Sequence, residues 1–252
     1  MADCTRADVC AVAVAEAFRG DGEILASSFG TVPAVGARLA KATFEPDLLM
    51  TDGTATLLEE PMPVSGDRPE AVAEAWMPFR SVFELLWNGK RHVVMVASQI
   101  DRFGNQNFSC IGPHEKPKAQ LLGMRGAPGN TLCHKTSYWV PNHSTRTFVE
   151  KVDCVSGVGN DRAAELGPVA RFHSLGRVIS NLGVFDFETP DRCMRLRSVH
   201  PGVGIDEVVE QTGFELVIEG DVPESRVPSD EELRWMREAI DPEGFANKEV
   251  PF

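Results

Sequence analysis

The sequence predicts an α/β protein with an open, mostly parallel sheet flanked by helices. Short apolar runs typical of strands alternate with segments of helical spacing along the whole chain. One such run, residues 91–98, leads directly into a polar, glycine-rich stretch over residues 99–130. This transition is typical of the carboxyl edge of a parallel sheet, where ligands bind. Because no linker interrupts the alternation, we expect a single domain over residues 1–252.

The first half of the chain predicts a βαβ arrangement preceded by a helix. Thr5 and Asp8 have the spacing of a helix-capping pair before an apolar helical pattern. The predicted elements are, in order, a helix over 7–18, a strand over 23–30, a helix over 33–44, a strand over 47–53, a helix over 77–89 and a strand over 91–98. Phe79, Phe83 and Leu86 share one face of the helix over 77–89, and we expect that face to pack on the sheet.

The second half of the chain has a more β-like texture. The stretches 136–143 and 146–157 are rich in residues that favour strands. Residues 177–188 and 193–202 predict two strands of a β-hairpin joined by Thr189-Pro190-Asp191-Arg192. A short helix and a strand follow over 204–218. Ser229 and Glu232 predict a second capping box before a closing helix that ends near residue 240.

Composition and charge limit the possible functions. The chain has 252 residues, 42% of them hydrophobic and 25% charged, as in ordinary globular proteins. A net charge of −12 argues against nucleic acid as the main partner, although local Arg, Lys or backbone N–H groups can still hold an anion. Six scattered cysteines without a C-x-x-C pair favour reduced thiols, and no His, Asp or Cys pair has metal-ligand spacing. We expect a cytoplasmic protein with no membrane span and no bound metal.

Several motifs together resemble the β subunit of the class I CoA transferases. They are QIDRFGNQN (99–107), GMRGAPGN (123–130), RTFVEKVD (146–153), SGVG (156–159), VISNLGVFDF and MRLRSVHPGVGIDEVVEQTGFEL (194–216). The resemblance covers nearly the whole chain in the order of the family. It implies the open class I CoA-transferase fold and a homologous α subunit, in an αβ or α2β2 complex. It also implies a site for an acyl-CoA where the two subunits meet, with no separate cofactor because CoA is part of the substrate.

The chain departs from the family at its catalytic residue. The β subunits of CoA transferases carry a nucleophilic glutamate at the end of the second strand, and here that position is Thr51 in Leu48-Leu49-Met50-Thr51-Asp52-Gly53. A hydroxyl needs a neighbouring base to become a nucleophile, whereas a carboxylate is already ionised at pH 7. Asp52 is one residue further, so on a regular strand its side chain points to the other face. A bulge or shifted register would bring it into the site.

Loss of the nucleophile favours a hydrolase in which water attacks the substrate. The TDG turn, RGAPGN, SYWVPNH and SNLGVFDF resemble a ring-opening branch of the family. That resemblance implies a steroid-derived cyclic acyl-CoA and water-driven, retro-Claisen-like C–C cleavage. Three alternatives stay open. They are a true CoA transferase that uses Asp52 or a partner residue, a non-catalytic subunit that stabilises the α chain, and a sugar-phosphate isomerase of related fold, for which we find no acid–base pair.

Arg125 is the first candidate for chemistry, because its guanidinium can bind a carboxylate or stabilise an enolate. The alternative is an arginine that pairs with the partner subunit. Thr51 and Asp52 are candidates for orienting water or substrate, or else form a capping turn. We expect the general base to be a glutamate of the α subunit.

The candidates for binding the acyl-CoA are Gln99, Asn105 (or Asn107), and the backbone N–H groups of Gly126 and Ala127. A structural role is the alternative for each: ordinary hairpin chemistry for the Gly104-Asn105 pair, and a simple turn for Gly126 and Ala127. For Trp139 and His143, a packed aromatic and a satisfied surface histidine are better interpretations than contact with a ring-shaped substrate.

Overall fold

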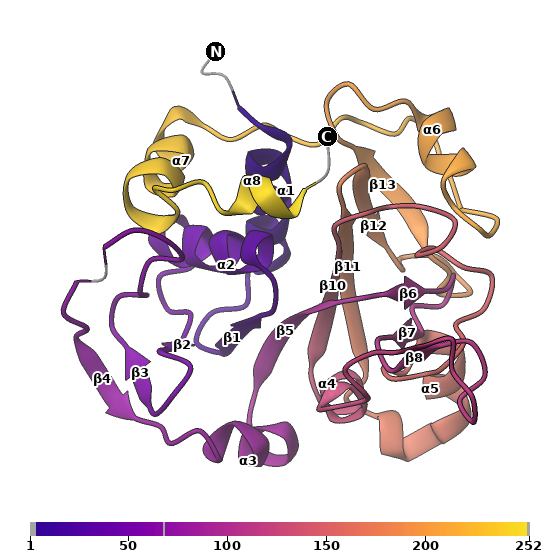
Figure 1. Ribbon diagram of the computed structural model, residues 1–252, viewed down its shortest axis with the longest axis horizontal. Helices are drawn as coiled ribbons and strands as arrows, with labels where there is room; N and C mark the ends of the chain where they lie inside the picture. Colours follow the sequence, from indigo (N-terminus) through magenta and orange to yellow (C-terminus); the bar gives the residue numbers. More distant parts are fainter. Residues whose placement is uncertain (1–3, 68, 251–252) are drawn as a thin grey trace. The chain divides into compact units, whose positions relative to one another are not determined.

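The structure is a computed structural model that describes residues 4–67 and 69–250 (Figure 1). The chain forms two compact units. The first comprises the residues up to 94 together with those from 226 onward, and the second comprises residues 95–225. Strand β5 (Arg91–Val96) leads from the first unit into the second. The expected single domain stays a prediction.

The first unit is built around a helix pair and a parallel strand pair. Strand β1 (Leu25–Ser28) runs parallel to β5 in the register Leu25↔Arg91. Helix α1 (Arg6–Ala17) is buried along most of its length and packs against α2 (Thr31–Thr43), as Figure 1 shows. The helices can approach closely because position 36 is glycine: a Cβ there would lie 2.6 Å from the carbonyl oxygen of Ala11. The C-terminal helices α7 (Asp230–Arg234), a π-helical turn (Trp235–Ile240) and α8 (Ala246–Glu249) complete this unit.

A small antiparallel sheet follows the second predicted strand. It contains β2 (Met50–Thr51), β3 (Thr56–Leu58) and β4 (Ala73–Trp76) in that order. Strand β4 is exposed along its whole length and leads to helix α3 (Ser81–Asn88). Just before β2, Leu49 forms a parallel bridge with Leu25, which is the expected βαβ connection.

The second unit contains four neighbouring strands of a six-stranded sheet and two small hairpins. These four strands have the order β10 (Lys135–Val140), β11 (Ser174–Ser180), β12 (Gly183–Asp186), β13 (Arg195–Val199). The β10–β11 pair is parallel and the next two pairs are antiparallel. The hairpins are β6 (Gln99–Ile100) with β7 (Gln106–Asn107), and β8 (Cys110–Ile111) with β9 (Ala119–Gln120). The helices are α4 (Ala127–Cys133), α5 (Asn160–Leu166), a 3-10 turn (Gly167–Ala170) and α6 (Ile205–Glu210).

The structure confirms the predicted α/β class with parallel strands and flanking helices. It also confirms both capping boxes, at Thr5 with Asp8 and at Ser229 with Glu232, and the antiparallel β12–β13 hairpin. Among the described residues, no helix is both long enough and apolar enough to cross a membrane.

Four local predictions are wrong. The strand expected after Gly213 is reduced to an isolated bridge between Val217 and Arg195. Residues 177–188 are not one strand, because the Ser180 hydroxyl accepts the N–H groups of Leu182 and Gly183 and stabilises a turn between β11 and β12. Residues 146–157 are mostly irregular, with isolated bridges at Phe148 and Gly157. The apolar face of α3 does not pack on a sheet: Leu86 is buried, whereas Phe79 and Phe83 are more than half exposed.

His143 is part of the core of the second unit, with Trp139 fully buried on the same segment. Its ring stacks on Phe148 with centroids 3.6 Å apart, and its two nitrogens contact the hydroxyls of Ser180 and Thr212 at 2.9 and 3.0 Å. Burial away from water lowers the pKa of His143 to about 3. The packed aromatic expected at Trp139 is confirmed, whereas the surface position expected for His143 is wrong because its ring is buried in the core.

The buried imidazole predicts a specific loss of stability in acid. The unfolded chain protonates His143 near pH 6.5 and the folded chain only near pH 3, so the unfolded state binds more protons between these values. The free energy of unfolding should therefore fall by up to about 1.4 kcal/mol per pH unit as the pH drops through this window. Urea titrations at several pH values give the slope of the free energy of unfolding against pH. This slope should be smaller in His143→Gln by the equivalent of about one proton. Equal slopes for the variant and the wild type would contradict the assignment.

Candidate active site

Thr51 and Asp52 form a tight turn at the end of β2. The Thr51 hydroxyl accepts the N–H of Gly53 at 3.1 Å. One carboxylate oxygen of Asp52, Oδ1, accepts the N–H groups of Thr54, Ala55 and Thr56 at 2.7, 2.9 and 3.1 Å. Both side chains therefore hold the β2–β3 connection.

The same hydrogen bonds determine the protonation of Asp52. The Thr54 N–H, reinforced by those of Ala55 and Thr56, holds the pKa of the Asp52 carboxyl below its ordinary value. Asp52 is solvent-exposed and ionised. Three donors on one oxygen stabilise the carboxylate and make it a weaker nucleophile than a free one.

Gln99 and Asn107 are buried amides, and Gln99 also binds the carboxylate of the exposed Asp153. Its Nε2 donates to Asp153 Oδ2 at 2.9 Å, and its Oε1 accepts from Asn107 Nδ2 at 2.7 Å and from the Asp153 N–H at 3.0 Å. Asn107 also donates to the Cys110 carbonyl at 2.7 Å. We call Gln99, Asn107 and Asp153 the amide cluster. Since every polar atom of the Gln99 side chain is engaged within the protein, Gln99 positions the loop between β7 and β8.

Asn105 belongs to a second buried group. Its Nδ2 donates to Asp101 Oδ2 at 3.0 Å and to Asp161 Oδ1 at 2.9 Å, and its Oδ1 accepts the Gly159 N–H at 2.8 Å. Burial raises the pKa of Asp101 to about 6. A Cβ at Gly159 would lie 2.5 Å from the Asn105 nitrogen, which explains the glycine in the SGVG motif.

Arg125 has an uncommon backbone conformation in the glycine-rich loop. Its φ is +51°, in the left-handed region that costs a residue with a Cβ about 1–2 kcal/mol. The side chain is exposed, and no described residue forms a hydrogen bond or an ion pair with its guanidinium. A strained backbone that presents an unpaired charge to solvent is typical of a binding or catalytic position.

Gly126 and Ala127 begin helix α4. The Ala127 N–H already donates to the carbonyl of Met124 at 3.1 Å, whereas the Gly126 N–H has no acceptor among the described residues. Gly126 is therefore the better donor for a developing oxyanion, beside Arg125.

Sequence reasoning missed several polar residues that build this region. Three of them are the carboxylates of Asp101, Asp153 and Asp161, which lie within the recognised motifs or next to them. Their role as partners of the amides is visible only in the tertiary contacts. The Tyr138 hydroxyl and Gln106 Oε1 are buried without a hydrogen-bond partner in the described chain. Both approach Gly157, whose hypothetical Cβ would lie 3.1 and 3.0 Å from them.

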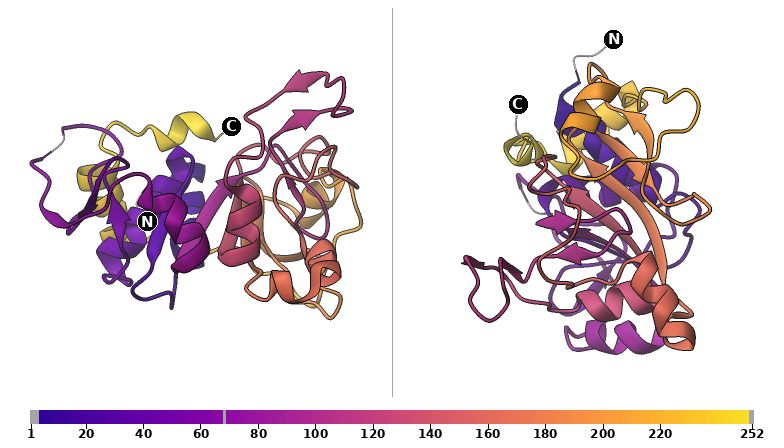
Figure 2. Two further views of the ribbon diagram at one scale, coloured as in Figure 1. Left: turned by 90° about the horizontal axis from the view of Figure 1, so that it is seen from below. Right: turned by 90° about the vertical axis from the view of Figure 1, so that its right-hand side faces the viewer.

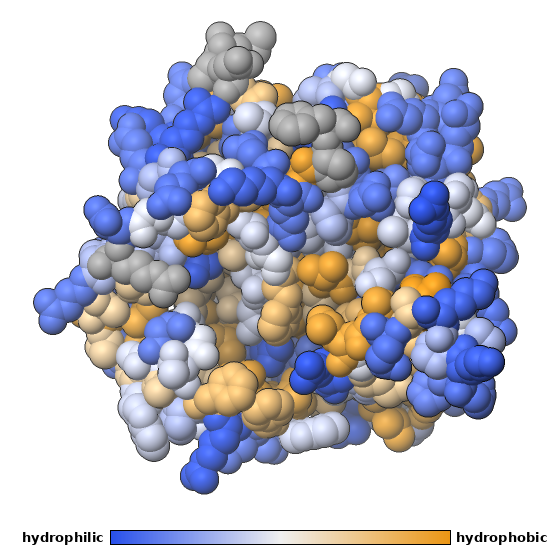
Figure 3. Space-filling view, in the orientation of Figure 1, coloured by the Kyte–Doolittle hydropathy of each residue, from blue (hydrophilic) through white to orange (hydrophobic). Residues whose placement is uncertain are grey.

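Exposed apolar side chains lie on and beside β4, a strand of the same small sheet as Thr51, and along the segment that leads into α3. We call Val72, Trp76, Phe79, Phe83 and Trp87 the aromatic surface; all five are more than half exposed, with Trp76 at 79% and Trp87 at 72%. Trp76 pairs with Thr56 across β3–β4, and β3 pairs with β2 through Thr51↔Leu57. Apolar residues gather over the region of α3 at the lower edge of the space-filling view (Figure 3). An apolar patch of this kind is typical of a surface that another molecule covers.

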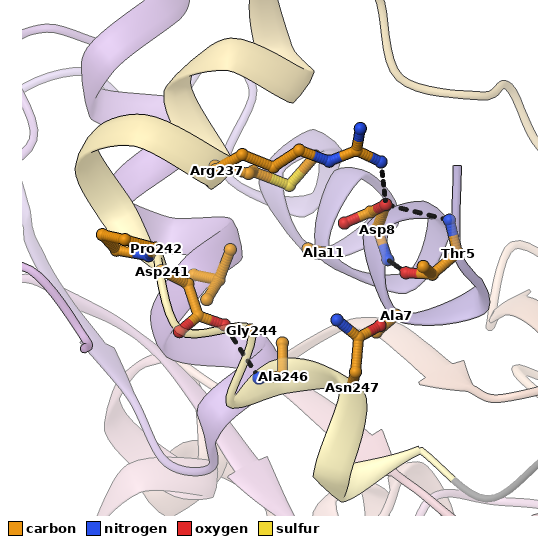
Figure 4. A pocket seen from close by; sticks show the side chains of 12 residues that line it. Thr5, Ala7, Asp8, Ala11, Arg237, Asp241, Pro242, Gly244, Ala246 and Asn247 are labelled. Atoms are coloured by element: carbon orange, nitrogen blue, oxygen red, sulfur yellow. Dashed lines mark hydrogen bonds and ion pairs between the residues drawn. The ribbon is translucent and has the colours of Figure 1, made fainter. Parts of the chain in front are cut away.

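A cavity of about 100 Å³ lies elsewhere in the first unit, between the start of α1 and the C-terminal segment (Figure 4). Asp8 lines it and pairs with Arg237 at 3.3 Å, while Asp241 accepts the Ala246 N–H at 2.8 Å. None of the predicted site residues lines this cavity, and its charged groups stabilise helix ends. Among the described residues, no three His, Cys, Asp or Glu side chains are placed to hold a metal ion.

The family model for coenzyme A transferase matches residues 10–211, and the chain belongs to this family. Its sequence is 52% identical to the cholesterol ring-cleaving hydrolase IpdB subunit of Rhodococcus jostii (strain RHA1), over 98% of this chain and 97% of the relative. It is 50% identical to the IpdB subunit of Mycobacterium tuberculosis (strain ATCC 25618 / H37Rv), over 98% of both. The crystal structure of Rhodococcus jostii RHA1 IpdAB contains a chain that superposes with a TM-score of 0.93 at 51% identity, covering 99% of this chain and 100% of that one.

Proposed function

We propose that this chain is the β subunit of a heteromeric hydrolase that opens the last ring of a steroid-derived acyl-CoA. The observation that carries the proposal is the turn at the end of β2. The position of the family nucleophile is a threonine whose hydroxyl accepts the Gly53 N–H, and the next carboxylate accepts three N–H groups. The Asp52 carboxylate is committed to the turn through Oδ1, while the sequence is half identical to subunits named as ring-cleaving hydrolases.

The reaction follows from the groups that the chain provides. Water adds to the carbonyl carbon of a ring ketone that lies β to a second carbonyl. The bond from this carbon to the carbon that separates the two carbonyls then breaks. One new C–O bond forms, the cleaved fragment becomes a carboxylate, and the electron pair of the broken bond becomes an enolate that takes up a proton. The Arg125 guanidinium and the Gly126 N–H are the donors proposed to stabilise this negative charge. The base that activates water is proposed to be a glutamate of the α subunit, and no cofactor besides the CoA of the substrate takes part.

The proposed partner is the homologous α subunit, and the aromatic surface is proposed to be part of the contact. A face with two tryptophans more than 70% exposed has the composition of an interface core, where Trp residues dominate the binding energy. Trp76 of this surface lies on the same small sheet as the Thr51 turn, so a subunit bound there brings its own residues toward that turn. The cytoplasmic location also belongs to the proposal, supported by six cysteines that form no disulfide.

Trapping of a covalent intermediate distinguishes the hydrolase from a CoA transferase, the second candidate, in which Asp52 is the nucleophile. The heteromer is exposed to acyl-CoA and then treated with hydroxylamine or borohydride, and peptides are examined by mass spectrometry. We expect no modified carboxylate. The isosteric variant Asp52→Asn should retain turnover within about tenfold, because its Oδ1 still accepts the three N–H groups. A hydroxamate or alcohol at residue 52, with loss of all turnover in Asp52→Asn, would establish the transferase instead.

Arg125→Gly separates a chemical role from a structural one. Glycine tolerates a φ of +51°, so the free energy of unfolding should stay the same or rise by up to about 1 kcal/mol. Loss of one charged donor should lower kcat of the heteromer about 100-fold. Arg192→Gly is the matched control, since Arg192 is another exposed arginine at positive φ, 54°, and it should keep full turnover. Unchanged turnover in Arg125→Gly would favour a subunit that only stabilises its partner.

The double variant Trp76→Ala/Trp87→Ala tests the aromatic surface. Both side chains are largely exposed, so the isolated chain should remain as stable as the wild type. Removal of two interface tryptophans should raise the Kd for the α subunit at least 30-fold, because one such residue contributes about 2 kcal/mol or more. Phe172→Ala, an exposed aromatic of the second unit, serves as control. A wild-type Kd for the double variant by calorimetry would exclude this surface from the contact.

A further inference from the structure

One segment of this acidic chain is strongly basic. Residues 102–135 contain five of the 25 lysines and arginines but only one of the 37 aspartates and glutamates, a net charge of +4. The rest of the chain carries −16. An anion with several phosphates is repelled by the acidic remainder and attracted to this segment, and such local fields steer charged ligands toward their sites.

The basic segment includes the hairpin β8–β9, which projects from the body of the second unit (Figure 2). At its tip, the Lys116 N–H donates to the Pro113 carbonyl at 3.1 Å, and the Lys118 N–H donates to the Ile111 carbonyl at 2.8 Å. The side chains of His114, Lys116 and Lys118 are exposed, and no described carboxylate pairs with them. The projecting tip therefore presents two unpaired ammonium groups.

The base of this hairpin is fixed to the amide cluster. Asp153 Oδ2, which accepts from Gln99, also accepts the Gly112 N–H at 3.0 Å. On the other strand, Gln120 Nε2 donates to the Ser109 carbonyl at 3.0 Å. Gly112 has a φ of +87°, and the stem of Lys118 passes directly over it: a Cβ there would lie 3.2 Å from Lys118 Cγ. Hydrogen bonds from both strands therefore hold in place the hairpin that contains the two lysines.

We propose that the β8–β9 hairpin binds the phosphate groups of a CoA thioester through Lys116 and Lys118. This inference rests on the proposed function, because it assigns the CoA end of that substrate. Coenzyme A carries its phosphates at one end of a long pantetheine arm and the thioester at the other. Lys118 and Arg125 are seven residues apart in the chain, at most about 25 Å when extended, so the same segment supplies cations for both ends of one elongated ligand.

The test is the binding of coenzyme A, and of pantetheine as a phosphate-free control, to the heteromer by calorimetry. The double variant Lys116→Glu/Lys118→Glu should raise the Kd for coenzyme A about tenfold or more and leave that for pantetheine unchanged. The variant should also lose most of the salt dependence of coenzyme A binding. Lys90→Glu/Lys151→Glu changes the net charge equally at two exposed lysines outside the hairpin and should behave as the wild type.

Three outcomes would overturn the inference. These are an unchanged Kd for coenzyme A, an equal loss in the hairpin variant and the control variant, and failure of the hairpin variant to assemble with the α subunit. The last would mean that the lysines contact an acidic face of the partner. Binding is measured without turnover, so a heteromer that fails to open any ring can still show hairpin-dependent binding of coenzyme A. Failure of the proposed function is therefore distinguishable from failure of this inference.

Discussion

The second unit depends on the hydrogen bonds of two buried amides, Gln99 and Asn107, with each other and of Gln99 with the exposed carboxylate of Asp153. Removing an amide from water without a partner costs about 1–3 kcal/mol. Here the amide and carboxylate groups satisfy one another across 54 residues of sequence. The Asp153 carboxylate reaches further to the Gly112 N–H, so the segment that ends β7 and the hairpin β8–β9 share one anchor. Hydrogen bonds among its own polar groups hold the stretch after β5 in place. The exposed charges lie on the loops that this network supports.

The candidate residues are thereby of two kinds: some hold the backbone of the site in place, and others expose an unpaired group to solvent. Gln99 and Asn105 are buried and fully engaged, whereas Arg125 is exposed, strained and unpaired. Thr51 and Asp52 have a supporting role in the first unit, because their oxygens hold the β2–β3 turn. A threonine at the position of the family nucleophile and a guanidinium in the glycine-rich loop are both consistent with attack by water followed by stabilisation of an enolate.

Local sequence signals predicted the elements whose stabilisation is local. The Thr5–Asp8 and Ser229–Glu232 pairs form the expected capping boxes because both partners lie within one turn of helix. The face of α3 was misjudged for the opposite reason. Helical periodicity identifies an apolar face but not what covers it, and Phe79 and Phe83 are exposed in the isolated chain. The network around Asp101, Asp153 and Asp161 was also inaccessible from sequence, since each carboxylate finds an amide through tertiary contacts.

The measurement that tests the central claim most directly is the fate of oxygen from solvent. The heteromer with its α subunit is incubated with a cyclic, ketonic steroid acyl-CoA in H2-18O, with and without an acceptor carboxylate. The masses of the products are then measured by mass spectrometry. The account predicts an opened ring that carries one 18O in its new carboxylate and retains its CoA, at a rate independent of the acceptor. Transfer of CoA to the acceptor, with the ring intact, would contradict it.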